Sequence, residues 1–145
     1  MMQLEHITFQ RRGAKHKKPF SQLYKRWFNP VPDGRMSLMV ELLRRLEAEV
    51  EAPPCWVCTS HASVIFYRRD VAVYGKEETG NFLFTVRFGY DEPGKSGTDV
   101  PTFVVCDCAN KTHQLNTVDE AIQTIIFILR EAGVVKAGEN DLSAR

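Results

Sequence analysis

The chain has 145 residues, of which 43% are hydrophobic and 26% are charged, and its formal net charge is +1. This length suits one domain, and such a composition is typical of a soluble protein with its own core. The longest apolar run, residues 125–129, is far shorter than the roughly 20 residues that span a bilayer. The N-terminus also lacks the long apolar stretch of a secretion signal. The sequence therefore predicts a cytoplasmic protein that makes no contact with a membrane.

The charge is unevenly distributed along the chain. Residues 1–36 contain eight Lys or Arg and two acidic residues, whereas residues 37–145 contain eleven Lys or Arg and sixteen acidic residues. The N-terminal part is thus basic and the remainder is acidic. This asymmetry predicts a basic arm that contacts either the acidic body of its own chain or an acidic partner.

Two helices are predicted in the first half of the chain. The first is short and amphipathic, and the prolines of NPVPDG (29–34) end it. The second covers residues 38–51, with Ser37 as its cap and Pro53-Pro54 as its stop. The apolar stripe of the first helix consists of Phe20, Leu23, Tyr24, Trp27 and Phe28.

From Trp56 onward the apolar residues recur with a period of two, which predicts strands. The first strand is ASVIFYRR (62–69), and VAVYG (71–75) is interpreted as its extension past a kink. The second is FLFTVRF (82–88), whose apolar residues at 82, 84, 86 and 88 are expected to share one face. The third is TFVVCDC (102–108), which follows a loop rich in Gly and Pro.

The last predicted element is a helix over residues 117–132. Thr117 and Glu120 form a capping box at its start, in which Glu120 is expected to reach back to the Thr117 amide, and Gly133 stands where a helix C-terminus favours glycine. This helix is apolar on nearly every side. It is therefore expected to be covered by the sheet and by another helix, or by a second copy of the chain in a homo-oligomer.

These elements predict an α+β fold. An antiparallel sheet of three or four strands packs on the two main helices, and a short helix with basic and aromatic residues precedes them. We expect a basic arm at 1–19, a single domain at 20–135 and a frayed tail at 136–145.

The four cysteines raise two alternatives. A zinc site formed by Cys55, Cys58, Cys106 and Cys108 would need all four sulfurs about 2.3 Å from one ion. The interior of the first pair, Trp56-Val57, favours a strand over a zinc knuckle, so structural thiols are the preferred interpretation and no metal is predicted. Cys58 with His61, or Cys108 with His113, would be a thiol nucleophile and its base, but no flanking signature supports this.

No nucleotide-binding loop or hydrolase motif occurs in the chain, so the sequence predicts neither an enzyme nor a cofactor. The leading hypothesis is a binding module that contacts nucleic-acid phosphates or an acidic protein surface. The alternative is a protein-binding inhibitor or adaptor, of a kind that a phage or mobile element would encode, acting through the sheet face and the arm. A small enzyme or ligand-sequestering protein is the third hypothesis, and a solvated tail is the alternative interpretation of the arm itself. The candidate binding residues are Arg11, Arg12, Lys15, Lys17, Lys18, Lys25 and Arg26.

Overall fold

A computed structural model describes residues 2–6, 19–31, 34–61, 63–69, 81–90 and 101–134. Within these residues the chain has an α+β fold of three helices and one mixed sheet of six strands. In chain order the elements are β1 (Leu4–His6), α1 (Phe20–Phe28), α2 (Ser37–Glu49), β2 (Cys55–Ser60), β3 (Ser63–Tyr67), β4 (Phe82–Tyr90), β5 (Pro101–Asp107), β6 (Thr112–Leu115) and α4 (Val118–Glu131).

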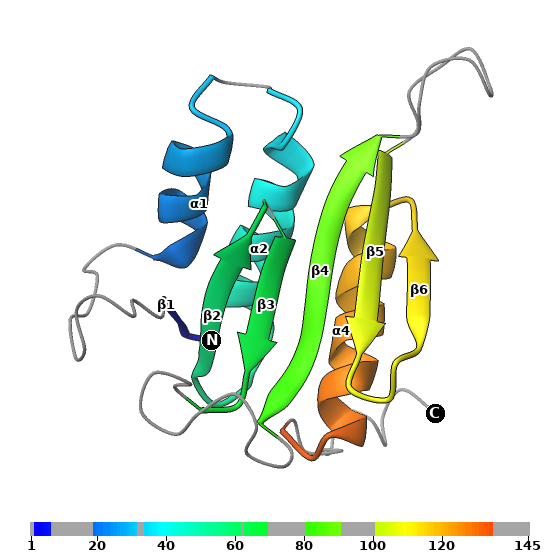
Figure 1. The fold of residues 1–145 in the computed structure, drawn as a ribbon. Coiled ribbons are helices and arrows are strands. Elements are labelled where there is room, and N and C mark those ends of the chain that lie inside the picture. Colours follow the sequence, from blue (N-terminus) through cyan, green and yellow to red (C-terminus); the bar gives the residue numbers. More distant parts are fainter. Residues whose placement is uncertain are drawn as a thin grey trace.

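The strands follow one another across the sheet in chain order, from β1 to β6 (Figure 1). From β2 onward each neighbouring pair is antiparallel, whereas β1 is parallel to β2. Parallel neighbours cannot be joined by a tight hairpin, so a crossover that includes α1 and α2 connects them. The helices lie on one side of the sheet, with α4 behind β4–β6 and α1 beside the β1 edge (Figure 1).

The sheet differs from the prediction of three or four antiparallel strands. The predicted strands at 62–69, 82–88 and 102–108 correspond to β3, β4 and β5, while VAVYG lies outside the described residues. β1 and β6 have too few apolar residues to show a period, and β1 belongs to the segment assigned to the arm. Met2 and Leu4 are buried, so the folded part includes residues that precede the basic run.

A bulge between β3 and β4 changes which residues of β4 face the helices. Phe66 pairs with Phe84, but Tyr67 pairs with Phe82, and the register shifts between them. Leu83 and Phe84 therefore both join the core under the helices, and Phe82 lies in a separate cluster with Tyr67. The expectation that residues 82, 84, 86 and 88 share one face is wrong at Phe82, because a bulge interrupts the alternation.

The start of α2 also differs from the prediction. Ser37 is the first residue of the helix and not its cap; the capping position is Met36, which provides no side-chain hydrogen bond. The buried Asn29 contributes from outside the helix, since its Oδ1 accepts a hydrogen bond from the Met36 amide at 3.3 Å. The structure thus uses the α1–α2 connection, not a local serine, to fix this end.

The two ends of α4 confirm the predicted roles of Thr117 at its start and Gly133 after its end. Thr117 is the N-cap, and its Oγ1 accepts a hydrogen bond from the Glu120 amide at 3.1 Å. The Glu120 carboxylate, however, contacts the Thr117 hydroxyl and not its amide. At the other end Gly133 has a φ of 74°, and the amides of Gly133 and Val134 bond to the carbonyls of Arg130 and Leu129. This pattern is a Schellman motif, which favours glycine because a side chain strains the left-handed backbone.

The apolar residues that surround α4 are only partly covered. Ile125 is fully buried between the sheet and α2, whereas 57% of Phe127 is exposed. The sheet and α2 thus cover the inward sides of this helix, and cover of the Phe127 side by a second copy of the chain stays a prediction. None of the described helices is long and apolar enough to cross a membrane.

Candidate functional site

The structure places two of the seven candidate binding residues. Lys25 and Arg26 lie in the last turn of α1, and both side chains are exposed. The other five, Arg11, Arg12, Lys15, Lys17 and Lys18, lie outside the described residues. Because Lys17 and Lys18 come immediately before Pro19 and α1, the sequence connects the basic run directly to this helix.

The burial of α1 explains why its basic residues face outward. Phe20, Leu23 and Tyr24 are buried, as a helical stripe of apolar residues predicts, and the helix packs against α2 and β1. Lys25 and Arg26 lie outside this stripe. Basic residues in the last turn also interact favourably with the helix dipole, so their position has a structural benefit of its own.

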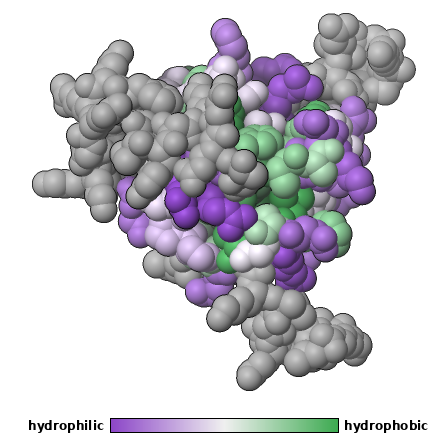
Figure 2. Space-filling model, turned by 60° about the horizontal axis from the view of Figure 1, so that its bottom comes forward, coloured by the Kyte–Doolittle hydropathy of each residue, from purple (hydrophilic) through white to green (hydrophobic). Residues whose placement is uncertain are grey.

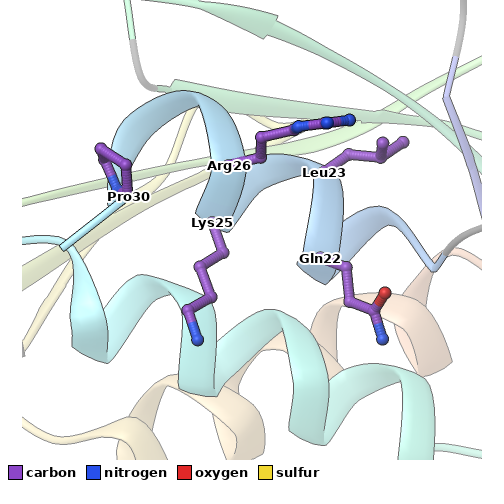
Figure 3. Close-up of a pocket in the computed structure, with 5 residues that line it drawn as sticks. All are labelled: Gln22, Leu23, Lys25, Arg26 and Pro30. Atoms are coloured by element: carbon purple, nitrogen blue, oxygen red, sulfur yellow. The ribbon is translucent and has the colours of Figure 1, made fainter. Parts of the chain in front are cut away.

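An open groove of about 380 Å³ lies along the outer side of α1. Its described lining consists of Gln22, Leu23, Lys25, Arg26 and Pro30 (Figure 3). The Lys25 and Arg26 side chains leave the helix in different directions, with Gln22 on the side of Lys25 and Leu23 on that of Arg26 (Figure 3). The two cations therefore flank the groove and do not converge on one point, as they would around a single small anion.

The aromatic residues of α1 divide into buried and exposed side chains. Tyr24 is fully buried, and its ring centroid lies 4.7 Å from that of Phe28. Trp27 instead has 42% of its surface exposed, although its ring lies nearly perpendicular to that of Phe20, with the centroids 6.4 Å apart. The sequence could not decide whether these aromatics pack or stack on a ligand. In the structure Tyr24 packs, and Trp27 combines packing with an accessible surface.

The N-terminus of α1 depends on a carboxylate from α2. The N-cap of α1, Pro19, provides no side-chain hydrogen bond. In its place Glu47 accepts hydrogen bonds from the amides of Phe20 and Ser21, the latter with an Oε2–N distance of 3.4 Å. Burial raises the pKa of Glu47, and the hydrogen bonds from Ser21 and Phe20 oppose this rise without cancelling it. Glu47 thus attaches the basic helix to the body of the domain.

Two substitutions of Glu47 are expected to have opposite effects on stability. Glu47→Ala removes the acceptor from two helix amides and should lower the free energy of unfolding by about 1–3 kcal/mol. Glu47→Gln keeps an acceptor oxygen and removes the half-buried charge, so at pH 7 it should be at least as stable as the wild type. Urea unfolding followed by circular dichroism measures both changes. Equal losses for the two variants would show that the charge itself holds the helix.

The raised pKa of Glu47 also fixes the sign of a pH dependence. A carboxyl group whose pKa is higher in the folded than in the unfolded state stabilises the fold below its unfolded pKa of about 4.3. This contribution is lost as the pH rises through the folded pKa. The Glu47 contribution should therefore fall as the pH is raised from about 4, and Glu47→Gln should remove it. The difference between wild-type and Gln stability, measured from pH 4 to pH 7, isolates this contribution.

The structure does not bring the four cysteines together. Cys55 and Cys58 lie on β2 but belong to different clusters on the two faces of the sheet, while Cys106 lies on β5 and Cys108 in the turn after it. Three strand spacings separate β2 from β5, roughly 14 Å. Among the described residues no group of three or more His, Cys, Asp or Glu could hold a metal ion. Burial raises the pKa of Cys55 to about 12, which keeps this thiol protonated and unreactive.

Cys106 and Cys108 do not belong to the buried core. Cys106 is only half-buried and Cys108 is exposed, because the strand ends at Asp107 and the chain turns there. Asp107 organises this turn: its Oδ1 accepts hydrogen bonds from the Ala109 and Lys111 amides, and its Oδ2 lies 3.2 Å from His113 Nε2. His113 is thus paired with a carboxylate that stabilises the hairpin, and not with a thiol.

A cluster of apolar residues lies on the face of the sheet opposite the helices. This outer-face cluster consists of Trp56, Cys58, Ile65, Tyr67 and Phe82. Trp56 pairs with Tyr67 across β2 and β3, and the rings of Tyr67 and Phe82 meet edge to face with centroids 6.2 Å apart. Tyr67 is buried, and this burial is the main cause that raises the pKa of its phenol. The neighbouring Cys58 raises this pKa further. Trp56, Tyr67 and Phe82 stand near the ends of β2, β3 and β4 that are drawn at the bottom of Figure 1, and Figure 2, in which the bottom comes forward, shows apolar surface among polar residues.

Sequence reasoning missed the outer-face cluster for a physical reason. The bulge moves Phe82 to the outer face, and a sequence period of two assigns it to the inner face. The alternation of Trp56 and Cys58 along β2 was the sequence signal that could have predicted apolar residues on the outer face.

Comparison with known proteins adds no site to these: the chain matches no protein-family model, and no curated protein or solved structure matches it.

Proposed function

We propose that this protein is a non-enzymatic module that binds nucleic-acid phosphates through its basic N-terminal segment and the outer surface of α1. The observation that supports it best is the groove of α1, which has Lys25 and Arg26 on its two sides. The basic run of residues 11–18 leads directly into this helix, and no acidic residue occurs between Glu5 and Asp33. A groove with two cations, on a helix that the basic run precedes in the sequence, suits a polyanion.

The divergent directions of Lys25 and Arg26 favour a polymer over a small anion. Cations that point apart cannot both bind one phosphate, but they can contact different phosphates of one strand. An acidic protein would also provide separated charges, yet five cations within the eight residues 11–18 favour a repeating array of phosphates.

The test is to measure binding of a fluorescein-labelled oligonucleotide by anisotropy for the Lys25→Ala, Arg26→Ala double variant. Loss of two phosphate contacts should weaken binding to a single strand by roughly tenfold or more at about 0.1 M salt. The matched control is Arg87→Ala with Lys111→Ala, which removes the same charge from two exposed positions on β4 and the β5–β6 turn. The control should bind almost as the wild type does.

Equal weakening in the two double variants would mean that only net charge matters and that α1 is not the binding surface. Absence of binding by the wild-type protein at low salt would refute the proposal as a whole. Both variants change exposed side chains, so neither should lower the free energy of unfolding by more than about 1 kcal/mol.

The outer-face cluster favours a second candidate function, a protein-binding inhibitor or adaptor. Its residues Trp56, Ile65 and Phe82 are apolar and only partly covered on a face that carries no described helix. A native mass spectrum of the protein isolated from its source cell tests this candidate. A protein partner that is lost after Ile65→Lys, without loss of oligonucleotide binding, would assign a separate function to this face.

A further inference from the structure

We infer that the nucleic acid bound at α1 is single-stranded, and that a base of the strand stacks on Trp27. This inference rests on the proposed function and specifies its ligand. It starts from the exposure of Trp27, which lies next to Arg26 in α1 and has 42% of its surface accessible, whereas Phe20 and Tyr24 of the same stripe are fully buried. A soluble domain gains nothing in core packing from the exposed part of this ring.

The position of Trp27 relative to the groove supports base stacking. Leu23, which lines the groove, lies four residues before Trp27 on the same side of the helix, so the indole adjoins the side of the groove where Arg26 extends. A strand whose phosphates contact Arg26 thus has an aromatic surface beside it. Basic grooves with adjacent aromatic rings bind single strands in this way, because every base has a face that can stack.

The contact of Trp27 with Phe20 limits the movement of the ring. The two rings meet nearly edge to face, and Phe20 is fully buried. A stacking platform held by a buried neighbour loses less conformational entropy on binding than a mobile side chain would. The bases of a duplex are stacked inside the helix and cannot reach this ring. A single strand can therefore use both the cations and the indole, whereas a duplex can use only the cations.

The test uses the two tryptophans separately. Trp56→Phe leaves Trp27 as the remaining tryptophan of the chain, and Trp27→Phe leaves Trp56 in the outer-face cluster. An unlabelled thymidine oligonucleotide of about 12 nucleotides, within the usual site size of a single-strand binder, is titrated into each variant. Quenching of indole fluorescence is expected for the Trp56→Phe protein and not for the Trp27→Phe protein.

Affinity measurements complete the test. Trp27→Ala should weaken single-strand binding by roughly 5- to 150-fold, the range that corresponds to one base–aromatic stack, and should leave duplex binding nearly unchanged. Trp27→Phe, which keeps a smaller aromatic face, should recover part of this loss. Circular dichroism melts show whether the Phe20 contact is needed for folding, and the Phe variant remains informative if the Ala variant unfolds.

The outcomes separate this inference from the proposed function. Equal binding of single strands and duplexes, with no quenching of Trp27, would overturn the inference and leave phosphate binding at α1 in place. Failure of both nucleic acids to bind the wild-type protein would overturn both proposals.

Discussion

Replacing Ile125 by Ala is expected to lower the free energy of unfolding by about 2–5 kcal/mol. Ile125 is fully buried in the core cluster that α4 forms with the sheet and α2. The substitution loses the transfer free energy of the removed methyl and methylene groups and leaves a cavity that close-packed neighbours fill only in part. Urea unfolding followed by circular dichroism measures the change.

The same helix provides the control. Phe127 lies two residues further along α4 with 57% of its surface exposed, so Phe127→Ala should change stability by less than about 1 kcal/mol. Thr117→Ala, which removes the N-cap of α4, should cost about 1 kcal/mol. A loss for Phe127→Ala as large as that for Ile125→Ala would mean that a second copy of the chain covers this side of the helix.

Local sequence signals predicted the helices well because the signals and their targets are close together in the chain. Thr117 caps α4 from three residues away, and Gly133 ends it through bonds to carbonyls within the last turn. Ser37 shows the limit of this reasoning, because Asn29 of a different segment bonds to the Met36 amide at the start of α2. A capping residue seven positions away has no fixed sequence pattern.

The sheet was harder to predict because strand pairing depends on distant residues. β1 has three residues, and its pairing with β2 places Leu4 opposite Cys55 across a crossover of about fifty residues. No period can be read from so short a segment. The bulge opposite Tyr67 likewise follows from pairing, and it determines that Leu83 and not Phe82 enters the core.

For the candidate site, the sequence identified the residue types but not their accessibility. The stripe spacing predicts the same burial for Tyr24 and Trp27. In the structure Tyr24 is buried and Trp27 is partly exposed, because α2 and β1 cover only one side of α1. Glu47 had no sequence signal at all, since its role depends on the approach of α2 to the start of α1. The peripheral position of α1 is what makes a basic helix accessible to a ligand.

Binding of a single-stranded oligonucleotide is expected to weaken steeply with salt. Each phosphate contact contributes roughly −0.7 to the slope of log affinity against log salt, so contacts from all seven candidate cations give a slope of about −5. Between about 50 mM and 200 mM salt the affinity should then fall by roughly a thousandfold. Anisotropy titrations at four or more salt concentrations measure the slope.

Replacing Arg11, Arg12, Lys15, Lys17 and Lys18 by Ala should reduce this slope to about −1.4, the contribution that remains from Lys25 and Arg26 on α1. All sequences should be weakened alike, because phosphate contacts carry no base information. The fold should survive, since Met2 and Leu4 in the core precede the substituted residues and Phe20 follows them. A slope that stays near −5 in the substituted protein would show that the basic run takes no part in binding, and the cations of α1 and the rest of the body would then have to account for it.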